Sequence, residues 1–102
     1  MGESEPIRFR SLGRAEPLGF EVPVATTWLS RLLGVAFLLR HRAGAGLLIP
    51  RCRSVHTFGM RFPLDVLFLD GEGRVIELRR GVPPGRVIRS ASAMAVLELP
   101  SP

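Results

Sequence analysis

The stretch of sequence that most limits the fold is "LDVLFLDGEGRVIEL", which runs from Leu64 to Leu78. Two apolar runs flank the tetrapeptide "DGEG" at 70–73, and this pattern is typical of two strands joined by a tight turn. In the second run apolar and polar residues alternate, so we expect Ile76 and Leu78 to point into the core. The sequence therefore predicts an antiparallel hairpin within the fold.

Short strand-like segments recur along the rest of the chain. "IRFR" at 7–10 and "GFEVPV" at 19–24 alternate, while "LLIP", "RVI" and "AMAVLEL" are brief apolar runs beside turn-forming residues. Only "TTWLSRLLGVAFL" has helical spacing, with Thr26 or Thr27 as its N-cap. We therefore expect a mostly β fold: a compact antiparallel β-sandwich or barrel of about seven short strands with one short helix.

Length and composition indicate one domain over residues 1–102. Hydrophobic residues make up 46% of the chain and charged residues 23%, which is a globular composition. The single cysteine, Cys52, excludes an internal disulfide. The N-terminus lacks the pattern of a secretory signal, and no apolar stretch reaches the roughly 20 residues that span a bilayer. We therefore expect a cytoplasmic protein without membrane contact, and the sequence leaves its oligomeric state open.

The charge of the chain is +5, and every basic residue is arginine. The arginine clusters are Arg40 with Arg42, Arg51 with Arg53, and Arg79 and Arg80 with Arg86 and Arg89. They make an RNA- or DNA-binding accessory protein an alternative function. No helix-turn-helix, RNA-binding motif or phosphate-binding glycine loop accompanies them. We therefore expect only weak nucleic-acid binding that is lost near physiological salt.

Polar residues interrupt the apolar stretch "SVHTFGMRFPLDVLFLD" at 54–70. A histidine on an apolar strand face is either a core residue bonded to a carbonyl or a ligand-binding group. A carboxylate at the start of a buried strand is costly unless it is paired or hydrogen-bonded. The candidate ligand-binding residues are His56, Thr57, Met60, Arg61 and Asp65.

Gly59 lies in the middle of this stretch and predicts a bulge or a close backbone approach that redirects its neighbours. We therefore predict a shallow pocket around residues 56–65, in which Arg61 binds a small anion or an acidic group of a protein partner. The structural alternative is that Arg61 pairs with Asp65, or that Asp65 caps the bend at 63–64.

These features favour a non-enzymatic binding module over an enzyme. In an extended strand Cys52 and His56 would lie about 13 Å apart, beyond the reach of a nucleophile–base pair. A small enzyme that uses His56, Arg61 and Asp65 is a further alternative. No C-x-x-C or H-x-x-x-H spacing indicates a metal site, and we expect no metal and no cofactor.

The segment "GLLIPRCRSVHTFGMRFPLDVLFLDGEGRVIEL", followed by "AVLELP", resembles the uncharacterised family called domain of unknown function 192. The upstream "ATTWLSRLLGVAF" is similar to the helix segment of that family. The family-typical positions in the central stretch are His56, Thr57, Met60, Arg61 and Asp65. The resemblance implies a small β-rich domain and implies no particular activity.

Overall fold

The computed structural model describes residues 12–27, 31, 34 and 46–102. The strand expected at 7–10 and most of the expected helix lie outside these residues. The described residues form eight strands: β1 (Arg14–Ala15), β2 (Val22–Pro23), β3 (Leu47–Pro50), β4 (Ser54–His56), β5 (Leu64–Leu69), β6 (Val75–Val82), β7 (Val87–Arg89) and β8 (Ala95–Pro100). No helix within these ranges has both the length and the apolar character needed to cross a membrane.

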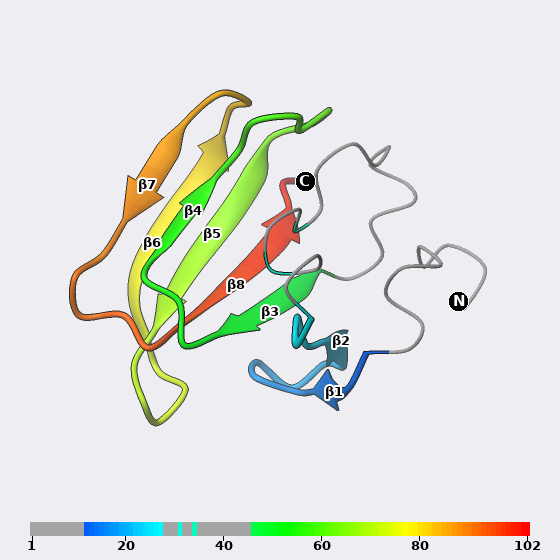
Figure 1. The fold of residues 1–102 in the computed structure, drawn as a ribbon, viewed down its shortest axis with the longest axis vertical. Helices are drawn as coiled ribbons and strands as arrows, with labels where there is room; N and C mark the ends of the chain where they lie inside the picture. The colour runs from blue at the N-terminus through cyan, green and yellow to red at the C-terminus, as the bar shows by residue number, and fades with distance from the viewer. Residues whose placement is uncertain (1–11, 28–30, 32–33, 35–45) are drawn as a thin grey trace.

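The strands form one large sheet and two small ones, and all paired strands are antiparallel. The large sheet has the order β3-β8-β5-β6, while β4 pairs with β7 and β1 pairs with β2. Figure 1 shows β4 and β7 as a second layer against the large sheet. The prediction of a mostly β, antiparallel fold is confirmed, and the two layers form a sandwich and not a closed barrel.

The core lies on both faces of β5. Val66 and Phe68 point toward the β4–β7 layer, where they pack with Val55 in one apolar cluster. Leu67 and Leu69 belong to a second cluster on the opposite face. Because both faces are covered, the sequence of β5 is a nearly continuous apolar run and does not alternate.

The predicted hairpin is confirmed, since β5 pairs with β6 across the turn at 70–74. The Asp70 carboxylate fixes this turn by accepting hydrogen bonds from the backbone amides of Glu72 (2.8 Å) and Arg74 (2.9 Å). These two amides, that of Arg74 first, hold the pKa of Asp70 below its usual value.

The expectation that Ile76 and Leu78 point into the core is wrong, because each side chain is 43% exposed. Ile76 occupies a register shift between the Phe68–Glu77 and Leu69–Val75 pairs, so it has no counterpart on β5. Leu78 does pair with a β5 residue, but β6 is the last strand of its sheet. Alternation therefore identified the strand correctly but not which of its faces is covered.

Candidate functional site

Thr57 is fully buried and connects the end of β4 to the loop between β6 and β7. Its amide donates to the Arg86 carbonyl (2.8 Å), and its carbonyl accepts from the Gly85 amide (3.1 Å). Its hydroxyl donates to the Pro83 carbonyl (2.7 Å) and accepts from the Arg86 amide (2.7 Å). The hydroxyl therefore holds the two ends of the loop, and Thr57 anchors this loop to the end of β4.

Asp65 is half-buried and lies opposite a bulge in β6. Two β6 residues, Arg80 and Gly81, stand opposite Asp65 between adjacent register pairs. The Asp65 carboxylate accepts hydrogen bonds from the Gly81 amide (2.9 Å) and the Ser101 hydroxyl (2.5 Å). Its partners are thus a backbone amide and a hydroxyl. The two structural alternatives, an ion pair with Arg61 and a cap on the bend at 63–64, are not among the interactions of the described residues.

Gly59 marks a tight turn and not a bulge in a continuous strand. The Met60 amide donates to the Thr57 carbonyl (3.2 Å), and Gly59 has a φ of 78°, a conformation that favours glycine. Past the turn, Met60 is buried in the core and Arg61 is exposed. None of Thr57, Met60, Arg61 and Asp65 lines the cavities described below, and their role in ligand binding stays a prediction.

His56 is half-buried, and its ring stacks on that of Phe58 with the centroids 5.7 Å apart. It also lines a cavity of about 230 Å³ together with Arg31 and Glu98, which we call the inner cavity. Glu98 lies on β8 and is only 3% exposed. A buried carboxylate, an imidazole and a guanidinium therefore line one small space.

Gly34 shapes the wall of the inner cavity beside Glu98. A Cβ atom at this position would lie 2.6 Å from the Glu98 Oε1 atom, and the φ of Gly34 is +54°. The absence of a side chain therefore makes room for the carboxylate. Our reading of the sequence missed Glu98, although a signal was present: in "AVLEL" it shares a strand face with Val96, so it is an acid in an inward-facing position.

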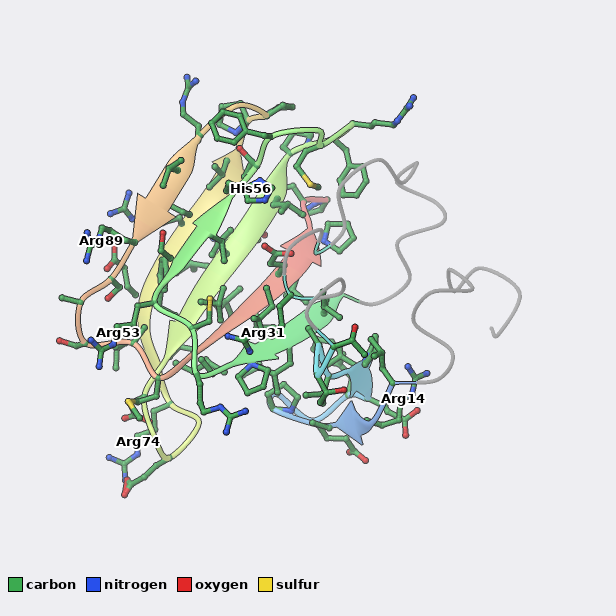
Figure 2. All side chains as sticks on the ribbon, in the orientation of Figure 1. Arg14, Arg31, Arg53, His56, Arg74 and Arg89 are labelled. Atoms are coloured by element: carbon green, nitrogen blue, oxygen red, sulfur yellow. The ribbon has the colours of Figure 1, made fainter. Side chains whose placement is uncertain are left out.

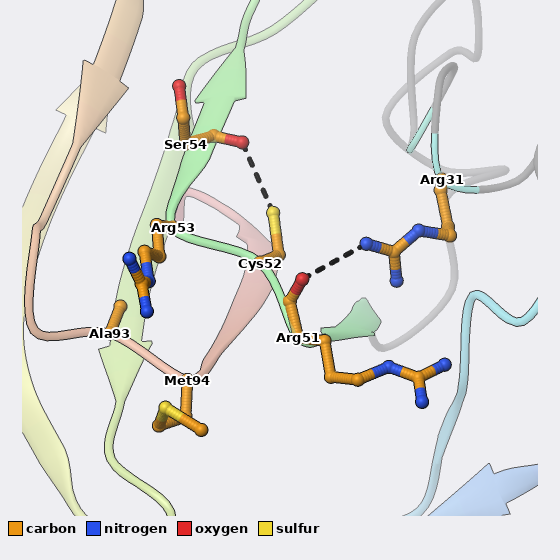
Figure 3. Close-up of a pocket in the computed structure, with 7 residues that line it drawn as sticks. All are labelled: Arg31, Arg51, Cys52, Arg53, Ser54, Ala93 and Met94. Carbon is orange, nitrogen blue, oxygen red and sulfur yellow. Dashed lines mark hydrogen bonds between the residues drawn. The ribbon is translucent and has the colours of Figure 1, made fainter.

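A larger cavity of about 500 Å³, which we call the outer cavity, lies beside the turn from β3 to β4 (Figure 3). Its lining residues are Arg31, Arg51, Cys52, Arg53, Ser54, Ala93 and Met94. Arg31 and Ser54 also line the inner cavity, so the two spaces adjoin. Among the described residues, the lining of the outer cavity thus contains three guanidinium groups and no carboxylate.

Backbone geometry places the groups of the outer cavity. Arg51 has a φ of 51°, and it is the only non-glycine residue with a positive φ in the part of the chain that the structure describes. The amide of Cys52 donates to the Met94 carbonyl (3.3 Å), and its thiol donates to the Ser54 carbonyl (3.1 Å). The first bond holds the turn against the segment that precedes β8, and the second lies within the turn.

Arg31 is the best fixed of the three arginines. Its guanidinium donates to the carbonyls of Pro50 (2.5 Å) and Arg51 (3.2 Å). Figure 3 shows Arg31 reaching the turn from one side of Cys52, with Arg53 on the other side. Arg51 and Arg53 are exposed. The cavity therefore has one anchored cation and two cations at its rim.

Metal binding has no candidate in the ranges that the structure covers. Those residues include no group of three or more histidine, cysteine or acidic side chains that could hold an ion.

Comparisons with known proteins identify relatives but no activity. A family model described as "Uncharacterized ACR" matches residues 11–101. No curated protein matches the chain significantly.

A crystal structure of a protein of unknown function from Novosphingobium aromaticivorans DSM 12444 is similar, with a TM-score of 0.63 and 18% identity over 94% of this chain and 86% of that one. A Sinorhizobium meliloti 1021 protein described as a "putative transcription regulator" has a TM-score of 0.69 and 24% identity over 80% of this chain and 69% of that one. Both likenesses concern the fold alone.

Proposed function

The chain belongs to domain of unknown function 192, an uncharacterised family, and we propose that it is a non-enzymatic module that binds small organic anions in the outer cavity. The observation that carries this proposal is the lining of the cavity, to which the part of the chain that the structure describes contributes three arginines and no acid. Such a concentration of guanidinium groups attracts carboxylates and phosphates, because the planar fork of each group can donate to two oxygens at once.

Arg31 is the expected primary ligand. A guanidinium has five N–H donors, and the carbonyls of Pro50 and Arg51 fix its position through two nitrogens. We expect the other donors of this guanidinium to bind the anion. Because the side chain is already ordered, binding requires less loss of conformational freedom than it would for a mobile arginine.

The remaining wall of the cavity defines the class of anion. Met94 is 49% exposed and Ala93 lies beside it, so one side of the cavity is apolar. Methionine adapts to irregular apolar shapes. We therefore expect a carboxylate or phosphate ester with a small apolar group to bind more tightly than an inorganic anion.

The test compares inorganic phosphate with phenyl phosphate by isothermal titration calorimetry. We expect phenyl phosphate to bind more tightly, and Arg53→Ala to weaken both ligands by up to about fivefold, as for loss of one exposed ion pair. Arg89→Ala is the matched control, since Arg89 is an exposed β7 residue that does not line the cavity. Equal losses in the two variants, or no binding by the unmodified chain, would refute the proposal.

An enzymatic function is a second candidate because His56 and Glu98 line the same inner cavity. Together they are a possible acid–base pair. The constellation predicted from the sequence is different, since neither Arg61 nor Asp65 lines this cavity. If the inner cavity is catalytic, His56→Gln and Glu98→Gln should each abolish turnover while phosphate binding in the outer cavity persists.

Nucleic-acid binding is the remaining alternative. The net charge of +5 and the description of the Sinorhizobium meliloti protein favour it. Binding along a nucleic acid also requires a continuous basic surface, and we expect the arginines to act at separate sites instead. Figure 2 shows arginines spread across the molecule: Arg14, Arg31, Arg53, Arg74 and Arg89.

A further inference from the structure

Strands β6 and β7 follow one another in the chain but do not pair. The four residues 83–86 join them, and so short a loop ordinarily connects two paired strands. Here β6 pairs with β5 and β7 pairs with β4, so the two strands belong to different layers. Figure 1 shows them at the same side of the sandwich, where neither has a further strand beside it.

Two polar anchors hold β6 and β7 in this separated arrangement. The Thr57 hydroxyl bonds both ends of the loop, at Pro83 and Arg86, and so ties this loop to the residue that follows β4. The Asp65 carboxylate binds the Gly81 amide and fixes the end of β6 to β5. The separation is therefore built into the fold by buried or half-buried side chains.

The separation leaves a groove of about 400 Å³ between the two strands. The groove is lined by residues 78–83 of β6 and the loop, together with Arg86 and Ile88. In an antiparallel pair, alternate residues of each strand direct their N–H and C=O groups away from the partner. The outer edge of β6 therefore offers backbone hydrogen-bonding groups to a further extended chain.

The lining of the groove indicates what kind of chain would bind. The described residues that line the groove include Arg79, Arg80 and Arg86 and no acidic residue. Arg79 pairs with Glu77, whereas the ion pairs formed by described residues include neither Arg80 nor Arg86. Leu78, which is 43% exposed, adds an apolar contact in the same groove.

We propose that the β6–β7 groove binds an extended acidic segment of a partner protein, which adds to the edge of β6 as a further strand. Backbone hydrogen bonds to β6 would supply affinity, and alternate side chains would supply specificity. Leu78 and Arg80 are two residues apart on β6 and share a face of the strand. Carboxylates on the corresponding face of the segment would bind Arg80 and Arg86, and small apolar side chains would occupy its other face. A second copy of the chain fits less well, because none of the described strands carries more than one acidic residue.

The probe is a fluorescent ten-residue peptide of alternating glutamate and valine, measured by anisotropy at low salt. We expect saturable binding that falls at least tenfold when all backbone amides of the peptide are N-methylated, because this change removes the backbone donors of both strand edges but keeps the charge. The double variant Arg80→Ala/Arg86→Ala should also lose at least tenfold in affinity. The matched control Arg51→Ala/Arg53→Ala removes the same charge from the outer cavity and should bind the peptide as the unmodified chain does.

Three results would overturn the proposal. Absence of binding would do so, and so would equal binding of the N-methylated peptide, which would indicate attraction by charge alone. The third is a dimer in sedimentation velocity that the Arg80→Ala/Arg86→Ala variant loses, since the edge of β6 would then be occupied by a second copy. Melting curves of both double variants check that these exposed substitutions leave the fold intact.

Discussion

The outer cavity and the β6–β7 groove both concentrate arginines, but they differ in what accompanies the charge. In the outer cavity the guanidinium of Arg31 is fixed by two carbonyls, and side chains form the walls. In the groove the arginines flank an open strand edge, so backbone groups form part of the surface. The same cation therefore favours a compact anion in one place and an extended chain in the other.

The largest effect we expect separates the two regions through Thr57. Thr57→Val keeps the shape of the side chain but leaves the Pro83 carbonyl and the Arg86 amide without their hydroxyl partner. We predict a loss of about 2–4 kcal/mol in the free energy of unfolding, measured by urea denaturation. Peptide binding to the groove should be lost while phosphate binding persists. Thr57→Ser retains the hydroxyl and is the control. A loss below about 0.5 kcal/mol in the free energy of unfolding of Thr57→Val would contradict the role of Thr57 as an anchor.

A second substitution tests the opposite region. Arg31→Lys keeps the charge but removes the fork that reaches both carbonyls. We predict that phenyl phosphate binds about tenfold more weakly by calorimetry, since a hydrogen bond to a charged group contributes roughly 1.5–3 kcal/mol. Affinity of the groove for the acidic peptide should not change. A parallel loss in both ligands would show that the two regions are not independent.

We expect a smaller difference between the two regions in how ligand affinity depends on ionic strength. Salt screens exposed charges, and a peptide with several carboxylates makes more such contacts than a single phosphate. We predict that peptide affinity falls more steeply than phenyl phosphate affinity as salt rises. Single-stranded RNA is the comparison ligand, and its binding should be lost by ~0.15 M salt. Tight RNA binding above this concentration would instead favour the nucleic-acid function.

The smallest effect concerns the β5–β6 turn, which lies outside both regions. The pKa of Asp70 is lowered in the folded chain from its usual value of 3.8. A lowered pKa stabilises the fold above pH 3.8, and this stabilisation is lost as the pH falls through the lower, folded value. Asp70→Asn should therefore be less stable than the unmodified chain at neutral pH, and the difference should shrink below pH 3.8. A constant difference in melting temperature across this range would contradict the assignment.

The parts of the fold that the sequence predicted are those determined by neighbouring residues. The β5–β6 hairpin depends on two apolar runs and the turn "DGEG", all within one short segment. The exposure of Leu78 depends on where β6 stands in the sheet, which no local pattern records. Alternation alone therefore predicted the wrong environment for this side chain.

The candidate site shows the same limit. Thr57 was predicted as a ligand-binding residue and Asp65 as a carboxylate that needs a partner. Their hydrogen-bond partners lie 29 residues away at Arg86 and 36 residues away at Ser101. Pairing of Asp65 with Arg61 was the structural alternative to the predicted pocket, and it rested on their closeness in sequence. For Glu98 the sequence pattern already indicated an inward position in a strand. That His56 and Arg31 line the same cavity could be learned only from the three-dimensional fold.

The backbone conformation of Arg51 affects whether selection would retain an arginine at the rim of the outer cavity. A non-glycine residue in the left-handed region costs roughly 1–2 kcal/mol, and Arg51 adopts it with a φ of 51°. Arg51→Gly would relieve this strain and also remove a rim cation. Selection for thermal stability alone would therefore favour glycine here, and an arginine would persist only in a lineage that needs its charge. In laboratory evolution for thermal stability without the ligand, we expect Arg51 to be replaced early. Its persistence would indicate that the fold, and not the anion, requires this arginine.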